Sequence, residues 1–187
     1  MHNLLASLLL LTSLAIAQDE LRLEGRLPAV VPDGAEVVAR AISDAGVTAP
    51  TLLAVARVDD NRFELRLPAA VDPGLLEEER MGCDEEDVLD LAYLPYLLVE
   101  QEGEVVGRLL LTDLPRQLWN YGTPARHGYF LYTPAPFTAE GKCGPGEISV
   151  SFDAGWNPVL VIAGADGMVL TDEDAPQSFG WHFDPQQ

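Results

Sequence analysis

Serine and histidine are the residues of this sequence that could support nucleophilic catalysis. Ser149, Ser151 and Ser178 are possible nucleophiles, and His127 and His182 are possible bases. The chain contains no Gly-x-Ser-x-Gly segment, the sharp turn that exposes a nucleophilic serine in many hydrolases. Two of the serines alternate with apolar residues, as on the outward face of a strand. We therefore expect no enzyme, and a secreted hydrolase with its catalytic groups on loops is kept as an alternative.

Acidic clusters are the candidate ligands for a metal ion, because carboxylates and loop carbonyls suit Ca²⁺. Asp59 and Asp60 precede Asn61, four acidic residues occupy 84–87, and Asp172 opens a third cluster. None of these clusters has the spaced pattern of an EF-hand, and runs of charge are more often solvated faces. We expect no cofactor, and if Ca²⁺ binds, the candidate ligands are Asp59, Asp60 and Asp172.

Aromatic residues crowd the last third of the chain and could form a binding surface. Exposed rings stack on sugars or anchor a protein partner, although most aromatic side chains belong to the core because of the large area they bury. A carbohydrate or other ligand binder that uses this cluster is a second alternative. The candidate binding residues are Trp119, Tyr121, Tyr129, Tyr132 and Trp181.

The sequence has two cysteines, Cys83 and Cys143. A single pair in an exported protein is expected to form a disulfide, although two separate buried thiols are the alternative. A bridge that closes a loop of about 60 residues contributes roughly 4 kcal/mol in the chain-entropy description. No histidine or further cysteine stands near either residue at ligand spacing, so a zinc site is not expected.

The N-terminal residues 1–17 have the pattern of a cleavable export signal. An apolar run over 4–14 is followed by Ala15-Ile16-Ala17, and no Asp, Glu, Lys or Arg occurs before Asp19. The run is too short to cross a bilayer comfortably, which takes about 20 residues. The alternatives are a retained anchor or a buried first helix. We expect a mature chain of 18–187 without a transmembrane segment, in the periplasm, the cell envelope or the medium.

The charge of the chain limits its partners. The sequence has 11 Lys and Arg residues against 30 Asp and Glu residues, a formal net charge of −19. Such a charge repels nucleic-acid backbones and anionic membrane surfaces. The partner is not identified by the sequence, and an envelope protein or a saccharide is the expectation.

Alternation of apolar and polar residues dominates the mature chain and predicts many short strands. Turn residues such as Asp59-Asp60-Asn61 and Glu102-Gly103-Glu104 separate them. Short strands at this spacing favour an all-β, antiparallel β-sandwich or two small packed sheets. The predicted strands lie at 21–27, 36–41, 51–58, 62–67, 96–101, 105–111, 118–121, 129–132, 137–143, 148–152, 157–163, 168–171 and 179–183.

A short helical insertion is expected near 72–93, between the two groups of strands. Leu75–Arg80 and Glu85–Tyr93 carry acidic residues early in each segment, and Asp84 is a possible N-cap. We expect one β-sandwich domain over 18–187, with a possible sub-boundary near 69–95.

Residues 21–68 resemble the carboxypeptidase regulatory-like, or transthyretin-like, β-sandwich of exported bacterial proteins. The matching pieces are 23–27, 35–39 and 58–68, and the last is similar to the family's turn-then-strand signature. Asn61 stands where that signature usually has Gly, and Asn tolerates a left-handed backbone. The resemblance implies a non-catalytic structural or binding sandwich.

The second half, over 129–143 and 152–159, is similar to the closing hairpin of uncharacterised exported envelope proteins. In those proteins a Gly-Trp-Asn turn, here Gly155-Trp156-Asn157, joins two strands. This likeness implies an architecture and no activity. The sequence as a whole predicts an exported, non-catalytic module with a binding or scaffolding role.

Overall fold

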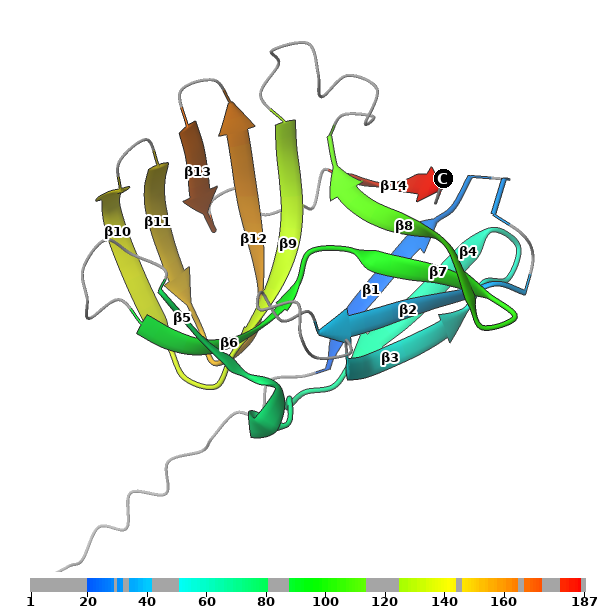
Figure 1. Ribbon diagram of the computed structural model, residues 1–187, viewed down its shortest axis with the longest axis horizontal. Helices are drawn as coiled ribbons and strands as arrows, with labels where there is room; N and C mark the ends of the chain where they lie inside the picture. The colour runs from blue at the N-terminus through cyan, green and yellow to red at the C-terminus, as the bar shows by residue number, and fades with distance from the viewer. Residues whose placement is uncertain are drawn as a thin grey trace, which may run out of the picture.

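A computed structural model describes residues 20–28, 30–31, 34–41, 51–80, 88–113, 125–143, 146–164, 167–172 and 179–185. Within these ranges most of the chain forms β-strands, so the predicted all-β class is confirmed (Figure 1). The predicted leader over 1–17, together with Cys83, Trp119, Tyr121 and Ser178, lies outside the described residues. The described part of the chain holds no helix long and apolar enough to cross a membrane.

Apart from the strands Glu77–Arg80 and Val88–Leu94, each described strand overlaps a predicted one, and the predicted strand at 118–121 lies outside the described residues. The strands are β1 (Leu21–Arg26), β2 (Glu36–Ala41), β3 (Thr51–Arg57), β4 (Arg62–Leu67), β5 (Glu77–Arg80), β6 (Val88–Leu94), β7 (Leu97–Gln101), β8 (Glu104–Thr112), β9 (Ala125–Thr133), β10 (Phe137–Cys143), β11 (Gly146–Phe152), β12 (Gly155–Gly164), β13 (Gly167–Thr171) and β14 (Gly180–Pro185).

Strands β1 and β4 form a two-stranded antiparallel ribbon that covers one part of a long bent sheet (Figure 1). The inward residues of the ribbon, such as Leu23 and Leu65, are buried against β2, β7 and β8, where Val37 and Leu109 are fully buried. Each such side chain stabilises the fold by about 1.5–3 kcal/mol relative to leaving it in water. The alternation in β1 and β4 therefore places the remaining side chains of the ribbon in solvent.

The turn between β3 and β4 fixes the register of the ribbon. Asp60 and Asn61 both have positive φ, at 47° and 56°. The backbone N–H groups of Asp59 and Arg62 donate to each other's carbonyls at 3.0 and 2.9 Å, as in a two-residue type I′ hairpin. Asn61 therefore adopts the left-handed backbone that asparagine tolerates. The N–H of Leu27 donates to the Asn61 carbonyl at 2.8 Å, which ties the end of β1 to this turn.

The long sheet has the order β10-β11-β13-β12-β9-β8-β7-β2-β3, with β14 on β8 and the β5–β6 hairpin on β9. All pairs are antiparallel except β11 with β13. Pro95 separates β6 from β7, and the two strands have different partners. Ala92 of β6 pairs with Tyr132 of β9, whereas Leu97 of β7 pairs with Leu109 of β8. Proline cannot donate to a ladder, so the strand changes partner at this point.

A second core lies between the β5–β6 hairpin and the sheet of β9 to β13 (Figure 1). Leu91 of β6 packs there with Leu131 of β9, Val150 of β11 and Val159 of β12, all of them buried. Leu94, at the end of β6, belongs to the core beneath the ribbon instead. The strand β6 therefore contributes side chains to both cores.

The predicted helical insertion is wrong. Among the described residues of 72–93, the only helical element is a single 3-10 turn at Pro73–Leu75. Asp72 caps this turn by accepting a hydrogen bond from the Gly74 N–H at 2.9 Å. Glu77–Arg80 forms β5 and Val88–Leu94 forms β6, which pair with each other. The acidic residues give only weak helical preference, and pairing with β9 together with burial of Leu91 outweighs it.

Candidate binding site

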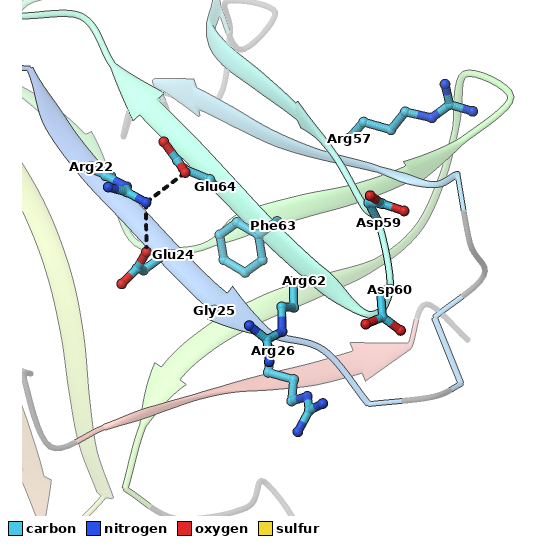
Figure 2. A pocket seen from close by; sticks show the side chains of 10 residues that line it. All are labelled: Arg22, Glu24, Gly25, Arg26, Arg57, Asp59, Asp60, Arg62, Phe63 and Glu64. Carbon is cyan, nitrogen blue, oxygen red and sulfur yellow. Dashed lines mark hydrogen bonds and ion pairs between the residues drawn. The ribbon is translucent and has the colours of Figure 1, made fainter.

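A broad depression lies on the outer face of the ribbon, at the end where β4 begins (Figure 2). Its volume is about 1030 Å³, and it draws its walls from β1, the end of β3, the β3–β4 turn and β4. Eight of the ten residues that line it carry a charge. The lining residues are Arg22, Glu24, Gly25, Arg26, Arg57, Asp59, Asp60, Arg62, Phe63 and Glu64.

Like charges face each other across the ribbon at three successive positions. Arg22 lies opposite Arg66, Glu24 opposite Glu64, and Arg26 opposite Arg62. The pattern arises because β1 and β4 both contain the sequence Arg-x-Glu-x-Arg, at 22–26 and 62–66, and run antiparallel. Like charges directly opposite each other destabilise a strand pair, so each position needs a compensating charge nearby.

Glu64 compensates the Arg22–Arg66 position. Its carboxylate oxygens accept from Arg22 Nη2 at 2.7 Å and from Arg66 Nη2 at 2.8 Å. Arg22 also lies 3.2 Å from Glu24, and Arg66 lies 3.7 Å from Glu20. The hydrogen bond from Arg66, helped by the charge of Arg22, lowers the pKa of Glu64, and the same contact raises the pKa of Arg66.

Within the described part of the chain, the Arg26–Arg62 position has no such partner. Among the residues that the structure describes, no carboxylate lies within ion-pair distance of Arg26, Arg62 or the nearby Arg57. Figure 2 shows Arg26 and Arg62 together at the end of the ribbon, while Arg57 extends away from them. Asp59 and Asp60 lie on the adjacent turn, where both are exposed. Among the described residues, the depression therefore contains cationic groups without an ion-pair partner, in a chain of net charge −19.

Trp181, a candidate binding residue of the sequence analysis, packs beneath this ribbon. Its ring meets Phe63 edge-on, with ring centres 5.7 Å apart, and its Nε1 donates to the Glu24 carbonyl at 3.2 Å. A Cβ at Gly25 would lie 2.4 Å from Trp181 Cδ1. The glycine therefore permits the close contact between β1 and β14 that supports the depression from below.

Tyr129 and Tyr132, two further candidates, lie on opposite faces of β9. Tyr132 is buried and meets Trp156 edge-on at 5.5 Å. Tyr129 meets Tyr93 edge-on at 5.4 Å, and burial raises its pKa against a smaller opposing effect of its hydrogen bond with Tyr93. The structure does not bring these two rings together in one exposed row.

The three candidate metal ligands lie in different parts of the molecule. Asp59 and Asp60 belong to the β3–β4 turn, whereas Asp172 follows β13 and accepts from the Ser151 N–H at 2.9 Å. In the described part of the chain, no group of three or more His, Cys, Asp or Glu residues is placed to hold a metal ion.

The candidate catalytic residues are also separated. Ser149 and Ser151 lie on β11, and His127 lies on β9, with β13 and β12 between them in the sheet. Three strand spacings amount to about 14 Å, far beyond the roughly 3 Å that a serine–histidine hydrogen bond needs. Burial lowers the pKa of His127, and the charge of Asp113 partly opposes this. His182 lies on β14, which pairs with β8.

No protein-family model, curated protein or solved structure matches this chain. Function therefore has to be inferred from the site itself. Sequence reasoning missed Arg26, Arg57 and Arg62, although the repeated Arg-x-Glu-x-Arg at 22–26 and 62–66 was a signal that could have identified two of them.

Proposed function

We propose that this protein is an exported, non-catalytic binding module of the periplasm or cell envelope that engages its partner through the depression on the β1–β4 ribbon. The observation that carries the proposal is the Arg26–Arg62 pair, two adjacent cations without a compensating carboxylate among the described residues. An arrangement that destabilises the free ribbon is expected where a ligand supplies the missing charge.

The rigidity of the ribbon supports a binding role. Phe63 and Leu65 are buried beneath it, the type I′ turn fixes its register, and Trp181 supports it from below. Binding groups held on strands keep their geometry better than groups on loops, so less ordering entropy is lost on binding. The separation of Ser149 and Ser151 from His127 supports a role without catalysis.

Site-specific photocrosslinking in cells of the native host tests the proposed location of the binding surface. A photoreactive amino acid replaces Glu24, at the rim of the depression, or Glu140 on β10 as a matched control, because both are exposed strand residues. The proposal predicts a covalent adduct of the exported protein, detected by intact mass whether the partner is small or macromolecular, from position 24 and none from position 140. No crosslink at position 24, or equal crosslinking at both positions, would contradict it.

The export half of the proposal has a separate test. The mature protein, recovered from the periplasm or the medium, is expected to begin at Gln18. Intact mass and N-terminal sequencing measure this directly. A protein that stays in the cytoplasm with residues 1–17 attached would rule out the exported role.

A further inference from the structure

We propose that Arg26 and Arg62 together bind a divalent tetrahedral oxyanion, a phosphate or sulfate group carried on a small ligand. This inference names a ligand class for the depression and rests on the proposed binding role. Three observations support this ligand class: the register of the ribbon, the contrast between its two arginine pairs, and the charge of the whole chain.

The register places the two guanidinium groups where they can converge on one ligand. The backbone N–H and C=O of Arg62 are both bonded to Asp59, so they do not bond to Arg26 on the opposite strand. Arg26 and Arg62 are therefore a non-hydrogen-bonded pair, the closer of the two kinds in an antiparallel ladder, with Cβ atoms about 4.5–5.5 Å apart. Both side chains are exposed on the outer face of the ribbon.

The Arg22–Arg66 pair shows how the ribbon accommodates two facing arginines. Glu64 lies between them and accepts hydrogen bonds from both, at 2.7 and 2.8 Å. An oxyanion between Arg26 and Arg62 would occupy the equivalent place at the other end of the ribbon. The two ends of the ribbon thus carry the same pair of arginines; a carboxylate joins one pair, and among the described residues none lies within ion-pair distance of the other.

The charge of the ligand follows from the charge of the pair. Two guanidinium groups carry two positive charges and many N–H donors, and each presents a planar fork that fits two oxygens. A divalent phosphate or sulfate group neutralises both charges and has enough oxygens for both forks. A monocarboxylate neutralises only one, so we expect it to bind more weakly.

The acidic surroundings limit the size of the ligand. Glu24, Asp59, Asp60 and Glu64 also line the depression, and the chain as a whole carries −19. A long polyanion or an anionic bilayer would be repelled by this field, whereas one small dianion would meet mainly the two arginines. The ligand is therefore expected to be a small molecule with one phosphate or sulfate group.

Titration of the ¹⁵N-labelled mature protein tests the inference by NMR, at constant ionic strength and pH 7.5. Inorganic phosphate and sulfate are expected to give saturable shifts at residues 24–27 and 60–64, and acetate only weak ones. R26Q and R62Q are each expected to lower the affinity for phosphate about tenfold or more, because hydrogen bonds to charged groups are the strong ones. R66Q removes the same single charge at a position outside the depression. Its affinity for phosphate should stay within about twofold of the wild-type value.

Two lysine variants and a vesicle experiment complete the test. R26K and R62K preserve the charge but remove the planar fork, and they are expected to bind with intermediate affinity even if a glutamine variant fails to fold. Shifts that do not saturate, or that are equal in the wild type and in R26Q and R62Q, would overturn the inference. If the protein sediments with vesicles of anionic phospholipid, the phosphate that it binds belongs to a lipid surface. That result would also overturn the proposal of a small-molecule ligand.

Failure of the anion test and failure of the proposed function are distinguishable. If phosphate and sulfate do not bind but position 24 still crosslinks to a partner, the docking surface stands and the ligand class is wrong. If position 24 does not crosslink, the proposed function fails whatever the result with phosphate.

Discussion

Arg26 of β1 lies directly opposite Arg62 of β4 at the exposed end of a two-stranded ribbon, and the part of the chain that the structure describes supplies no carboxylate to either. The other end of the same ribbon holds the same pair of residue types with Glu64 between them. This contrast suggests that the free protein keeps an unfavourable charge contact that a ligand relieves. Removing that contact should therefore change stability and binding in opposite directions.

Arg62→Glu is the substitution that tests this opposition. It replaces a repulsion with an attraction to Arg26, so the free energy of unfolding is expected to rise by about 0.5 kcal/mol, the usual size for an exposed cross-strand pair. Affinity for phosphate should be lost in the same variant. Urea unfolding at low ionic strength measures the first effect. Arg66→Gln is the comparison, because it removes one of the two ion pairs of Glu64 and leaves the pair with Arg22. A lower stability for Arg62→Glu would show that the arginine pair is not a source of repulsion.

Gly25 makes possible the contact between β1 and Trp181. Gly25→Ala places a Cβ 2.4 Å from Trp181 Cδ1 and 2.8 Å from Phe63 Cε1, so one ring or the strand must move. We expect a loss of about 1–3 kcal/mol in unfolding free energy, as for overpacking in a core. Gly180→Ala on β14 is the control, since its Cβ would meet its nearest neighbour at an ordinary 3.8 Å. Thermal unfolding of both variants gives the comparison, and equal midpoints would contradict the role of Gly25.

The strands that the sequence predicts best are those with one buried face. Arg62-Phe63-Glu64-Leu65 shows the alternation of buried and exposed side chains directly, and the bounds of β2, β4 and β10 agree with the prediction. The helices predicted over Leu75–Arg80 and Glu85–Tyr93 fail because acidic residues near a segment start are a weak local signal. Pairing of β6 with β9, more than 30 residues away, outweighs that signal.

The candidate site depends on register, which no local pattern contains. Arg26 and Arg62 become neighbours only because β1 pairs with β4 and the Asp60-Asn61 turn sets their alignment. A one-residue slip of either strand would turn the arginine of that strand to the core face. The aromatic residues are candidate binding residues by their chemistry, but Tyr132 is buried, and Trp181 packs against Phe63.

The pKa of Glu64 predicts a pH dependence of stability. Its folded-state pKa is lowered from the ordinary value of 4.5, chiefly by the hydrogen bond from Arg66. Between the two values the unfolded chain binds more protons, so this contribution is complete above about pH 5 and is lost as the pH falls through the lowered pKa. Glu64→Gln should remove this part of the dependence. Urea midpoints from pH 3 to 7 measure the difference between the two proteins, and parallel curves would contradict the prediction.

A disulfide between Cys83 and Cys143 remains a prediction, and it has a direct test. Cys143 ends β10, the edge strand that pairs with β11, so a bridge would fasten this edge to the segment between β5 and β6. Its loop of about 60 residues implies a loss of roughly 4 kcal/mol on reduction. Peptide mapping without reductant should yield one linked pair, and a reductant should lower the melting temperature of the wild type but not of Cys83→Ser/Cys143→Ser. Two free thiols in the exported protein would exclude the bridge, and β10 would then be held by its pairing with β11 and by the packing of Phe137 and Ala139 in the second core.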